Sequence, residues 1–349
     1  MTAAPSYLIL MLTDRCNLNC SYCYLGKQKH SMDSPQGIDM SLDTIDHIFE
    51  LENIDKNTNH IQITGGEPFL VPHLIKYTAI KAKKYCPEAT LAIQTNATLM
   101  DEDSLNLIQE FGINIGISLD GEPPLQEAQR GKAAATFQAL HLMEKKQIPF
   151  NITTVVTSKN IDKLSRLVLM LGAFSMARGI GLDPLVIKGS AINSSICGAE
   201  QSRIEKSIGK MTAALDMINN NRRTPLLIRE MERIKNRYNA SSATAFCHAA
   251  IGKSLAVTPQ GELFPCSQTA WDYDFFLGTM DTIDTINFSS QLESCRLENA
   301  LQCKNCSVDL HCPGDCPSRL YYNTNGSREF ACTLYQSLMS SINSEMETI

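Results

Sequence analysis

The stretch LTDRCNLNCSYCY, residues 12–24, places Cys16, Cys20 and Cys23 in one short loop directly after an apolar run. Three thiolates in so tight a loop can bind three irons of a [4Fe–4S] cubane, which leaves the fourth iron without a protein ligand. An iron with an open position is a binding site for another molecule. The alternative is a zinc knuckle that lacks its fourth ligand, since His30 lies seven residues beyond the loop.

The composition of the chain is that of an ordinary globular protein. Its 349 residues carry 31 Lys and Arg against 37 Asp and Glu, and 43% of them are hydrophobic. This balance excludes wholesale disorder, and the net charge of −6 argues against a nucleic-acid partner. The longest apolar runs, such as residues 7–12, are too short to span a bilayer, and the N-terminus lacks a signal-peptide pattern. The sequence therefore predicts a cytoplasmic protein with no membrane partner.

Around the cysteine loop, short apolar runs alternate with amphipathic stretches, which is typical of parallel βαβ units. The expected strands are Tyr7–Leu12, His60–Thr64, Thr90–Thr95, Ile113–Leu119, Asn151–Val156 and Gly179–Ile187. The expected helices are Leu42–Glu52, Pro72–Cys86, Asp101–Phe111, Ala133–Lys146 and Ile161–Leu171, with N-caps at Ser41 and Asp101. Units of about 30 residues favour a partial, six-unit (β/α) barrel of the TIM type. A doubly wound open sheet has the same local pattern, so periodicity alone leaves both open.

The domain organisation follows from a change of character along the chain. Residues 1–190 form the predicted barrel, residues 191–245 a helical linker with a turn at residues 219–223, and residues 246–349 a small cysteine-rich α+β domain. Residues 255–258 and 263–264 read as a hairpin, and a final helix is expected to begin near Cys332.

The cysteine loop resembles the Cys-x3-Cys-x2-Cys motif of the radical S-adenosylmethionine (SAM) superfamily, with Tyr22 as the aromatic residue before the third cysteine. Polar residues at the expected strand ends agree with this resemblance. The resemblance implies cofactor contacts for Tyr22, Gly65, Gly66, Glu67, Pro68, Asn96 and Ser118. It also implies a [4Fe–4S] cluster whose open iron binds SAM, and an enzyme that generates a 5′-deoxyadenosyl radical to remove a hydrogen atom from its substrate.

The C-terminal cysteines form a second pattern. Of 13 cysteines in the chain, eight lie within residues 247–332, a density that indicates metal or redox ligation in a reducing compartment. The order of seven of them resembles the SPASM domain, which binds two auxiliary iron–sulfur clusters; a zinc ribbon would need fewer thiolates. The resemblance implies one cluster held by Cys303, Cys306, Cys312 and Cys332, and another held by Cys247, Cys266 and Cys316.

The second auxiliary cluster is one ligand short. Some relatives carry an additional cysteine where Ser241 stands in this chain. Either one iron of this cluster is open, or a distant residue completes it. Cys197, Cys295 and His248 are the candidates, although each also reads as a structural residue.

Two further motifs bear on the substrate. Sulfatase-maturing relatives carry an Asp base directly after the second SPASM cysteine, whereas Ser267 follows Cys266 here, which argues against formylglycine formation. The stretch CPGDCPSRLY, residues 312–321, matches the Cys-x3-Cys-Pro-x-Arg-x-Tyr pattern of peptide-modifying members. The stretch SLDG, residues 118–121, and Arg130 resemble the same members.

The resemblance therefore implies an oxidoreductase-type maturase that installs a C–C or C–S cross-link in a ribosomally synthesised precursor peptide. Its expected partners are that peptide, a flavodoxin- or ferredoxin-type electron donor and, because the first strand begins at about Tyr7, a separate leader-recognition protein. The alternative is an enzyme for a small molecule, through alcohol dehydrogenation or cofactor or tetrapyrrole maturation. An iron–sulfur carrier without catalysis would not need Gly65–Pro68, and RNA modification does not suit the acidic charge.

Overall fold

The computed structural model of the chain forms two compact units, which we describe separately. The first unit contains residues 1–19, 25–116 and 247–294, and the second contains residues 20–24, 117–246 and 295–349. The residues that the structure describes are 5–51, 54–238, 245–285, 292, 306, 312, 314–323 and 328–347.

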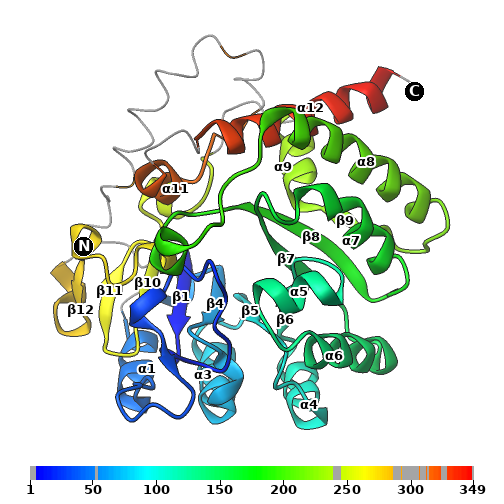
Figure 1. Ribbon diagram of the computed structural model, residues 1–349. Helices are drawn as coiled ribbons and strands as arrows, with labels where there is room; N and C mark the ends of the chain where they lie inside the picture. Colours follow the sequence, from blue (N-terminus) through cyan, green and yellow to red (C-terminus); the bar gives the residue numbers. More distant parts are fainter. Residues whose placement is uncertain are drawn as a thin grey trace. The chain divides into compact units, whose positions relative to one another are not determined.

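The first unit is organised around a mostly parallel sheet (Figure 1). Strand β1 (Tyr7–Met11) pairs in parallel with β4 (His60–Thr64) on one side and with β10 (Ser254–Val257) on the other. Strand β5 (Thr90–Thr95) continues the sheet beyond β4. The apolar run of β1 is buried on both faces, as expected for a strand in a parallel sheet that helices cover.

The hairpin predicted near residue 260 is confirmed. Strand β11 (Glu262–Phe264) runs antiparallel to β10, and β12 (Gly278–Thr279) runs antiparallel to β11. Gly261 at the turn has a φ of +79°, a conformation that glycine adopts without strain.

Three helices of the first unit begin within one residue of their predicted starts. Helix α1 (Leu42–Phe49) is capped by the Ser41 hydroxyl, which accepts from the Thr44 amide, and α4 (Glu102–Phe111) by the Asp101 carboxylate. Both predicted N-caps are thus confirmed. Between them lie α2 (Ile54–Asn57) and α3 (Pro72–Tyr85).

The second unit also has a parallel sheet with helices. Strands β7 (Phe150–Val156), β8 (Ala177–Pro184) and β9 (Leu227–Ile228) pair in that order. Strand β6 (Asn114–Ser118) runs across the boundary of the two units. The helices are α5 (Pro123–Gln129), α6 (Ala133–Lys146), α7 (Leu164–Leu171), α8 (Gln201–Asn219), α9 (Arg229–Tyr238), α11 (Pro317–Tyr322) and α12 (Arg328–Glu347).

These elements confirm the predicted α/β class, since each of the six predicted strands and five predicted helices has its counterpart within a few residues. The sequence analysis missed α2, α5, α11, β9 and β12. The domain boundaries at residues 190 and 245 stay a prediction, and Cys303 and Cys295 lie outside the described residues.

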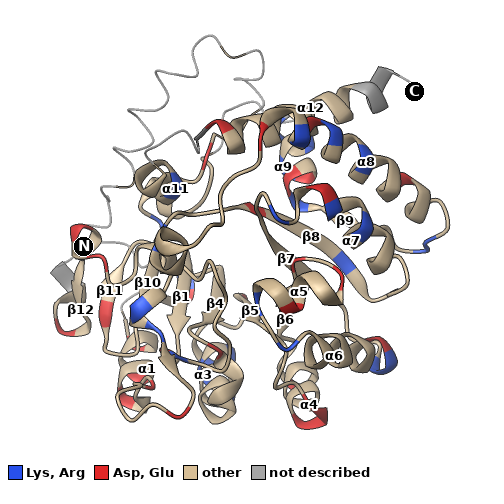
Figure 2. Cartoon of the chain, viewed as in Figure 1, with Lys and Arg blue, Asp and Glu red and all other residues tan. Residues whose placement is uncertain are grey.

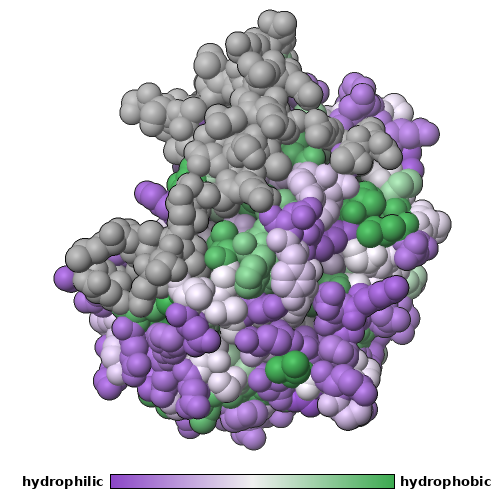
Figure 3. Space-filling view, turned by 90° about the vertical axis from the view of Figure 1, so that its left-hand side faces the viewer, coloured by the Kyte–Doolittle hydropathy of each residue, from purple (hydrophilic) through white to green (hydrophobic). Residues whose placement is uncertain are grey.

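The surface is mixed in character. Acidic and basic residues are interspersed along the helices in Figure 2. Hydrophobic areas on the face in Figure 3 are small and lie between hydrophilic ones. Among the described residues, none of the helices has both the length and the apolar character needed to cross a membrane.

Candidate active site

The Gly-Gly-Glu segment lies directly against the backbone that leads into Cys16. The Gly66 amide donates to the Thr13 carbonyl at 2.7 Å, and the Glu67 amide donates to the Arg15 carbonyl at 2.8 Å. A Cβ at Gly66 would lie 2.5 Å from the carbonyl carbon of Arg15. The close approach of these two backbones therefore requires glycine at position 66.

Glu67 joins the ends of strands β4 and β5. Its carboxylate accepts from the Thr95 hydroxyl at 2.6 Å, the Asn96 amide at 2.8 Å and the Phe69 amide at 3.1 Å. The residue is 1% exposed. The carboxylate of Glu67 thus forms these internal hydrogen bonds, and its predicted contact with the cofactor stays a prediction. Pro68 begins the short 3₁₀ turn Pro68–Leu70 that follows.

Burial raises the pKa of Glu67 to about 7, although its three hydrogen bonds act in the opposite direction. Because the folded-state pKa lies above the ordinary value of 4.5, the folded protein binds this proton more tightly than the unfolded chain. The associated stability is present below the unfolded pKa and is lost as the pH rises through about 7.

We therefore expect the free energy of unfolding of the iron-free protein to fall by up to ~3 kcal/mol from Glu67 alone between pH 4.5 and pH 7. Chemical denaturation at a series of pH values, for the wild type and Glu67→Gln, measures this contribution. In the Gln variant, the free energy of unfolding should fall less steeply with pH over this range. An identical pH dependence in both proteins would contradict the assignment.

Asn96 belongs to a closed ring of side chains beside the cysteine loop. Its amide nitrogen donates to the Asn17 side-chain carbonyl at 2.9 Å, Asn17 donates to the Thr98 hydroxyl at 2.8 Å, and Thr98 donates back to Asn96 at 2.7 Å. Because Asn17 directly follows Cys16, the ring fixes the backbone on that side of the cysteine. The sequence analysis did not identify Asn17 or Thr98.

The other side of Cys16 is held by carboxylates. The buried Asp14 side chain accepts from the Ile38 amide at 2.9 Å and contacts His30 at 3.2 Å. Arg15 forms an ion pair with Asp39. His30 thus lies close to the loop, as a partner of Asp14.

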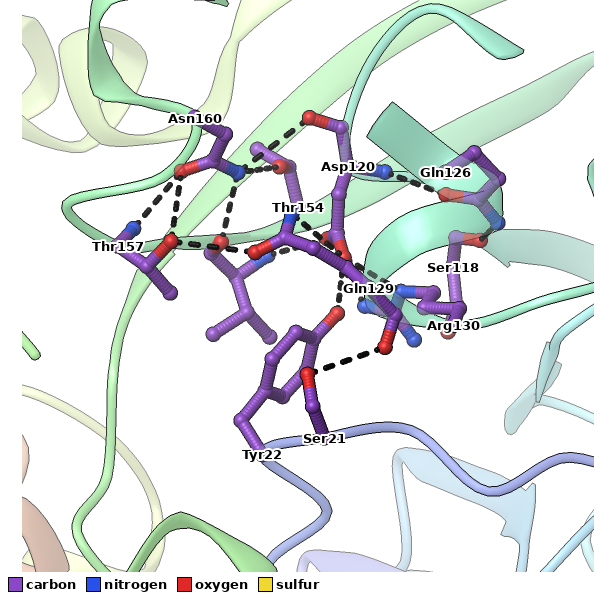
Figure 4. Close-up of polar contacts among 11 residues, drawn as sticks. Ser21, Tyr22, Ser118, Asp120, Gln126, Gln129, Arg130, Thr154, Thr157 and Asn160 are labelled. Atoms are coloured by element: carbon purple, nitrogen blue, oxygen red, sulfur yellow. Dashed lines mark hydrogen bonds and ion pairs between the residues drawn. The ribbon is translucent and has the colours of Figure 1, made fainter. Parts of the chain in front are cut away.

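Figure 4 shows a second network, in the second unit, which meets the loop at Tyr22. The Tyr22 hydroxyl donates to Asp120, which also receives the Arg130 guanidinium through two bonds of 2.9 and 3.1 Å. Tyr22 is 6% exposed. Its burial raises the pKa of the phenol well above the ordinary value, and Arg130 only partly offsets this. Tyr22 is therefore a neutral donor at neutral pH.

Backbone bonds hold the remaining part of the loop. The Ser21 amide and hydroxyl donate to the Gln129 carbonyl at 3.1 and 3.2 Å, and the Ser190 amide donates to the Cys23 carbonyl at 2.9 Å. The Cys23 amide donates to the Cys20 carbonyl at 3.2 Å. Both predicted iron ligands of this segment thus lie in a turn with defined backbone contacts.

Ser118 ends strand β6 and is half-buried, and its carbonyl accepts from the Gln126 side chain at 3.3 Å. The predicted contact of its hydroxyl with a cofactor stays a prediction.

The predicted iron ligands are partly accessible. Those that the structure describes are half-buried or exposed, namely Cys16, Cys20, Cys23, Cys247, Cys266, Cys306, Cys312, Cys316 and Cys332. Within the described ranges, no three His, Cys, Asp or Glu side chains are grouped closely enough to hold a metal ion, so the ligand sets stay predictions. By contrast, Cys86 is a buried core residue, and its burial raises the pKa of the thiol to about 11.

The Cys-Pro-x-Arg-x-Tyr motif forms helix α11 and contacts the end of strand β8. Arg319, 3% exposed, donates to Asp315 at 2.6 and 2.8 Å and to the Pro184 carbonyl at 3.5 Å. Asn323, which directly follows α11, donates to the Leu185 carbonyl at 2.9 Å. The cysteine-rich segment is thus bonded to the carboxyl end of a parallel strand, where enzymes of barrel type place their substrates.

Comparisons with known proteins show to which family the chain is related. The Radical SAM superfamily profile matches residues 10–171. An uncharacterised protein of Methanocaldococcus jannaschii is 33% identical over 279 residues, which cover 76% of this chain and 86% of that protein. The serine-type anaerobic sulfatase-maturating enzyme of Klebsiella aerogenes is 24% identical over 321 residues, 87% of this chain and 78% of the enzyme. The subtilosin biosynthesis protein AlbA of Bacillus subtilis is 29% identical over 304 residues, 82% of this chain and 60% of AlbA.

The fold is also that of a solved structure. Native anSMEcpe with bound AdoMet and Cp18Cys peptide superposes with a TM-score of 0.77 at 18% identity, over 98% of this chain and 97% of the other. The profile names the superfamily, and the relatives with a named function include two proteins for the maturation or biosynthesis of other polypeptides. The chain belongs to the radical SAM superfamily.

Proposed function

We propose that this enzyme is a peptide maturase that removes a hydrogen atom from a side chain of a ribosomally synthesised precursor and installs a C–C or C–S cross-link. Membership of the superfamily implies a [4Fe–4S] cluster and SAM. The proposal adds two auxiliary clusters in the cysteine-rich segment, a flavodoxin- or ferredoxin-type electron donor and a separate leader-recognition protein.

The observation that carries the proposal is the contact of the Cys-Pro-x-Arg-x-Tyr motif with the end of β8. Arg319 and Asn323 bond to the strand end and to the loop after it. A cysteine-rich segment fastened at this edge suits a substrate that must reach both the radical and an auxiliary cluster. Two similar proteins support a peptide substrate: AlbA is named for the biosynthesis of a bacteriocin, and anSMEcpe was solved with a peptide.

The backbone beside Cys16 supports the proposed site. Gly65 and Gly66 lie against the backbone that leads into Cys16. A Cβ at Gly65 would collide with Thr13, and a Cβ at Gly66 would collide with Arg15. Cys16, Cys20 and Cys23 would hold the cluster. When bound, the cluster and SAM supply the radical that takes the hydrogen atom. The hydrogen bond from Asn96 to Asn17 and the ion pair between Asp120 and Arg130 orient the loop.

Formylglycine formation is an alternative function, because sulfatase-maturating enzymes are among the similar proteins. Ser267 begins a 3₁₀ turn directly after Cys266, in the place that the family resemblance gives to an Asp base. A serine hydroxyl cannot take up a proton at neutral pH as a carboxylate can. An AdoMet-dependent heme synthase of Methanosarcina barkeri, 28% identical over 189 residues, favours a small-molecule substrate as the second candidate.

Coexpression with a short precursor gene from the same locus, followed by mass spectrometry, tests the proposal. We expect the peptide to lose the mass of two hydrogen atoms per cross-link. Cys266→Ala should still form 5′-deoxyadenosine but yield no cross-linked peptide, because the auxiliary cluster is expected to accept the electron left after bond formation. Ser267→Ala is the matched control and should give normal product. Normal product from Cys266→Ala would assign that cluster a structural role only.

A further inference from the structure

The Asp120 carboxylate receives donors from four separate places in the second unit. They are the Tyr22 hydroxyl, the Arg130 guanidinium, the Val155 amide at 3.1 Å and, at 3.5 Å, the Gln129 side chain (Figure 4). Asp120 is 1% exposed. So many donors around one buried carboxylate fix its position.

Arg130 provides the compensating charge. Its guanidinium carbon lies 5.2 Å from the centre of the Tyr22 ring, and its side chain is largely buried. Burial opposes the charge, but Asp120, Tyr22 and Cys20 together raise the pKa of Arg130 above its ordinary value. Because Tyr22 lies between Cys20 and Cys23 and bonds to the same carboxylate, the guanidinium lies beside the segment that carries both cysteines.

The network controls the two residues that separate Cys20 from Cys23. Tyr22 bonds to Asp120, and both donors of Ser21 bond to the carbonyl of Gln129, the residue before Arg130. The Tyr22 ring also packs in an apolar cluster with Leu185, Ala191 and Ile196. The conformation of the cysteine loop thus depends on the ion pair at its side.

Charge near a cluster changes how easily the cluster is reduced. Reduction adds one negative charge, which a nearby cation stabilises and a nearby anion destabilises, and the effect is larger in a buried, low-dielectric setting. We propose that the Asp120–Arg130 ion pair positions the Cys20–Cys23 loop and sets the reduction potential of the iron–sulfur cluster held there. This inference rests on the proposed radical SAM cluster.

A potentiometric titration of the iron-loaded enzyme without SAM, followed by electron paramagnetic resonance, tests the electrostatic part. Arg130→Gln removes a positive charge and should lower the potential. Asp120→Asn removes a negative charge and should raise it, and the double variant should return towards the wild type. Glu122→Gln is the control, since this exposed carboxylate pairs with Arg166 at 3.5 Å and should leave the potential unchanged.

Shifts in the same direction, or no shift, would overturn the inference. If the pair were merely structural, its loss would disturb the loop in the same way in both single variants, and the potential would shift in the same direction. A wild-type enzyme without any cluster would instead contradict the proposed function, so the two failures are distinguishable.

Removal of one partner of a buried ion pair leaves the other charge buried and unpaired, which opposes folding of the single variants. If they fail to fold, Tyr22→Phe decides, because it keeps the ring and removes only the bond to Asp120. Amide hydrogen exchange in residues 20–24 should become faster. Tyr77→Phe, which removes a Tyr–Asp bond of 2.7 Å to Asp46 in the first unit, should leave that exchange unchanged. Unchanged exchange in Tyr22→Phe would refute the positioning role.

Discussion

Replacement of Cys20 by alanine is expected to abolish the formation of 5′-deoxyadenosine by the reduced enzyme. The wild type should cleave SAM slowly even without a peptide, because the cluster and SAM alone suffice for this step. Loss of one of three thiolates removes the cluster and with it the iron that binds SAM. Chromatographic measurement of deoxyadenosine after anaerobic reduction gives the result.

Cys197→Ala is the matched control, because this exposed cysteine lies outside the loop and its thiol donates to the Ser158 hydroxyl at 3.4 Å. It should retain the wild-type rate. A Cys20→Ala variant that forms deoxyadenosine at that rate would refute the assignment of the radical site.

Iron content checks the same assignment without turnover. Three [4Fe–4S] clusters correspond to about 12 iron atoms per chain, and the triple replacement of Cys16, Cys20 and Cys23 by alanine should leave about eight. A protein with stoichiometric zinc and no iron would end this interpretation in favour of the zinc knuckle.

The strands and long helices could be predicted because their signals are local. Apolar runs of five to eight residues form the parallel strands. At the two helix starts, the side chains of Ser41 and Asp101 accept from the backbone amide three residues later. Helix α5 was missed because its seven residues begin with two prolines, which read as a turn.

The site could be predicted only as far as family resemblance reaches. Cys16, Gly66 and Glu67 were identified by motif, and the structure brings them together through the bonds from residues 66 and 67 to the backbone before the cysteine. Gln129 and Asn323 were missed, because they act through bonds between segments that lie about 100 or more residues apart in the chain. Such pairs leave no periodic pattern in one sequence.

The site requires glycine at position 66. We expect Gly66→Ala to lower the stability of the iron-free protein by about 3 kcal/mol, the upper part of the range for overpacked sites. The new methyl group would meet the backbone of Arg15, which cannot move aside, because the Thr13 and Arg15 carbonyls accept the amides of Gly66 and Glu67.

Gly209→Ala is the matched control for this change. Gly209 is an exposed residue in the middle of helix α8, and no neighbouring atom lies within 4 Å of a Cβ placed there. Alanine should therefore stabilise the protein by about 0.5–1 kcal/mol, since glycine loses more conformational freedom in a helix. Midpoints of urea denaturation should move in opposite directions for the two variants. A Gly66→Ala protein as stable as the wild type would show that the two backbones are not in contact, and the support of Cys16 by this segment would then have to be abandoned.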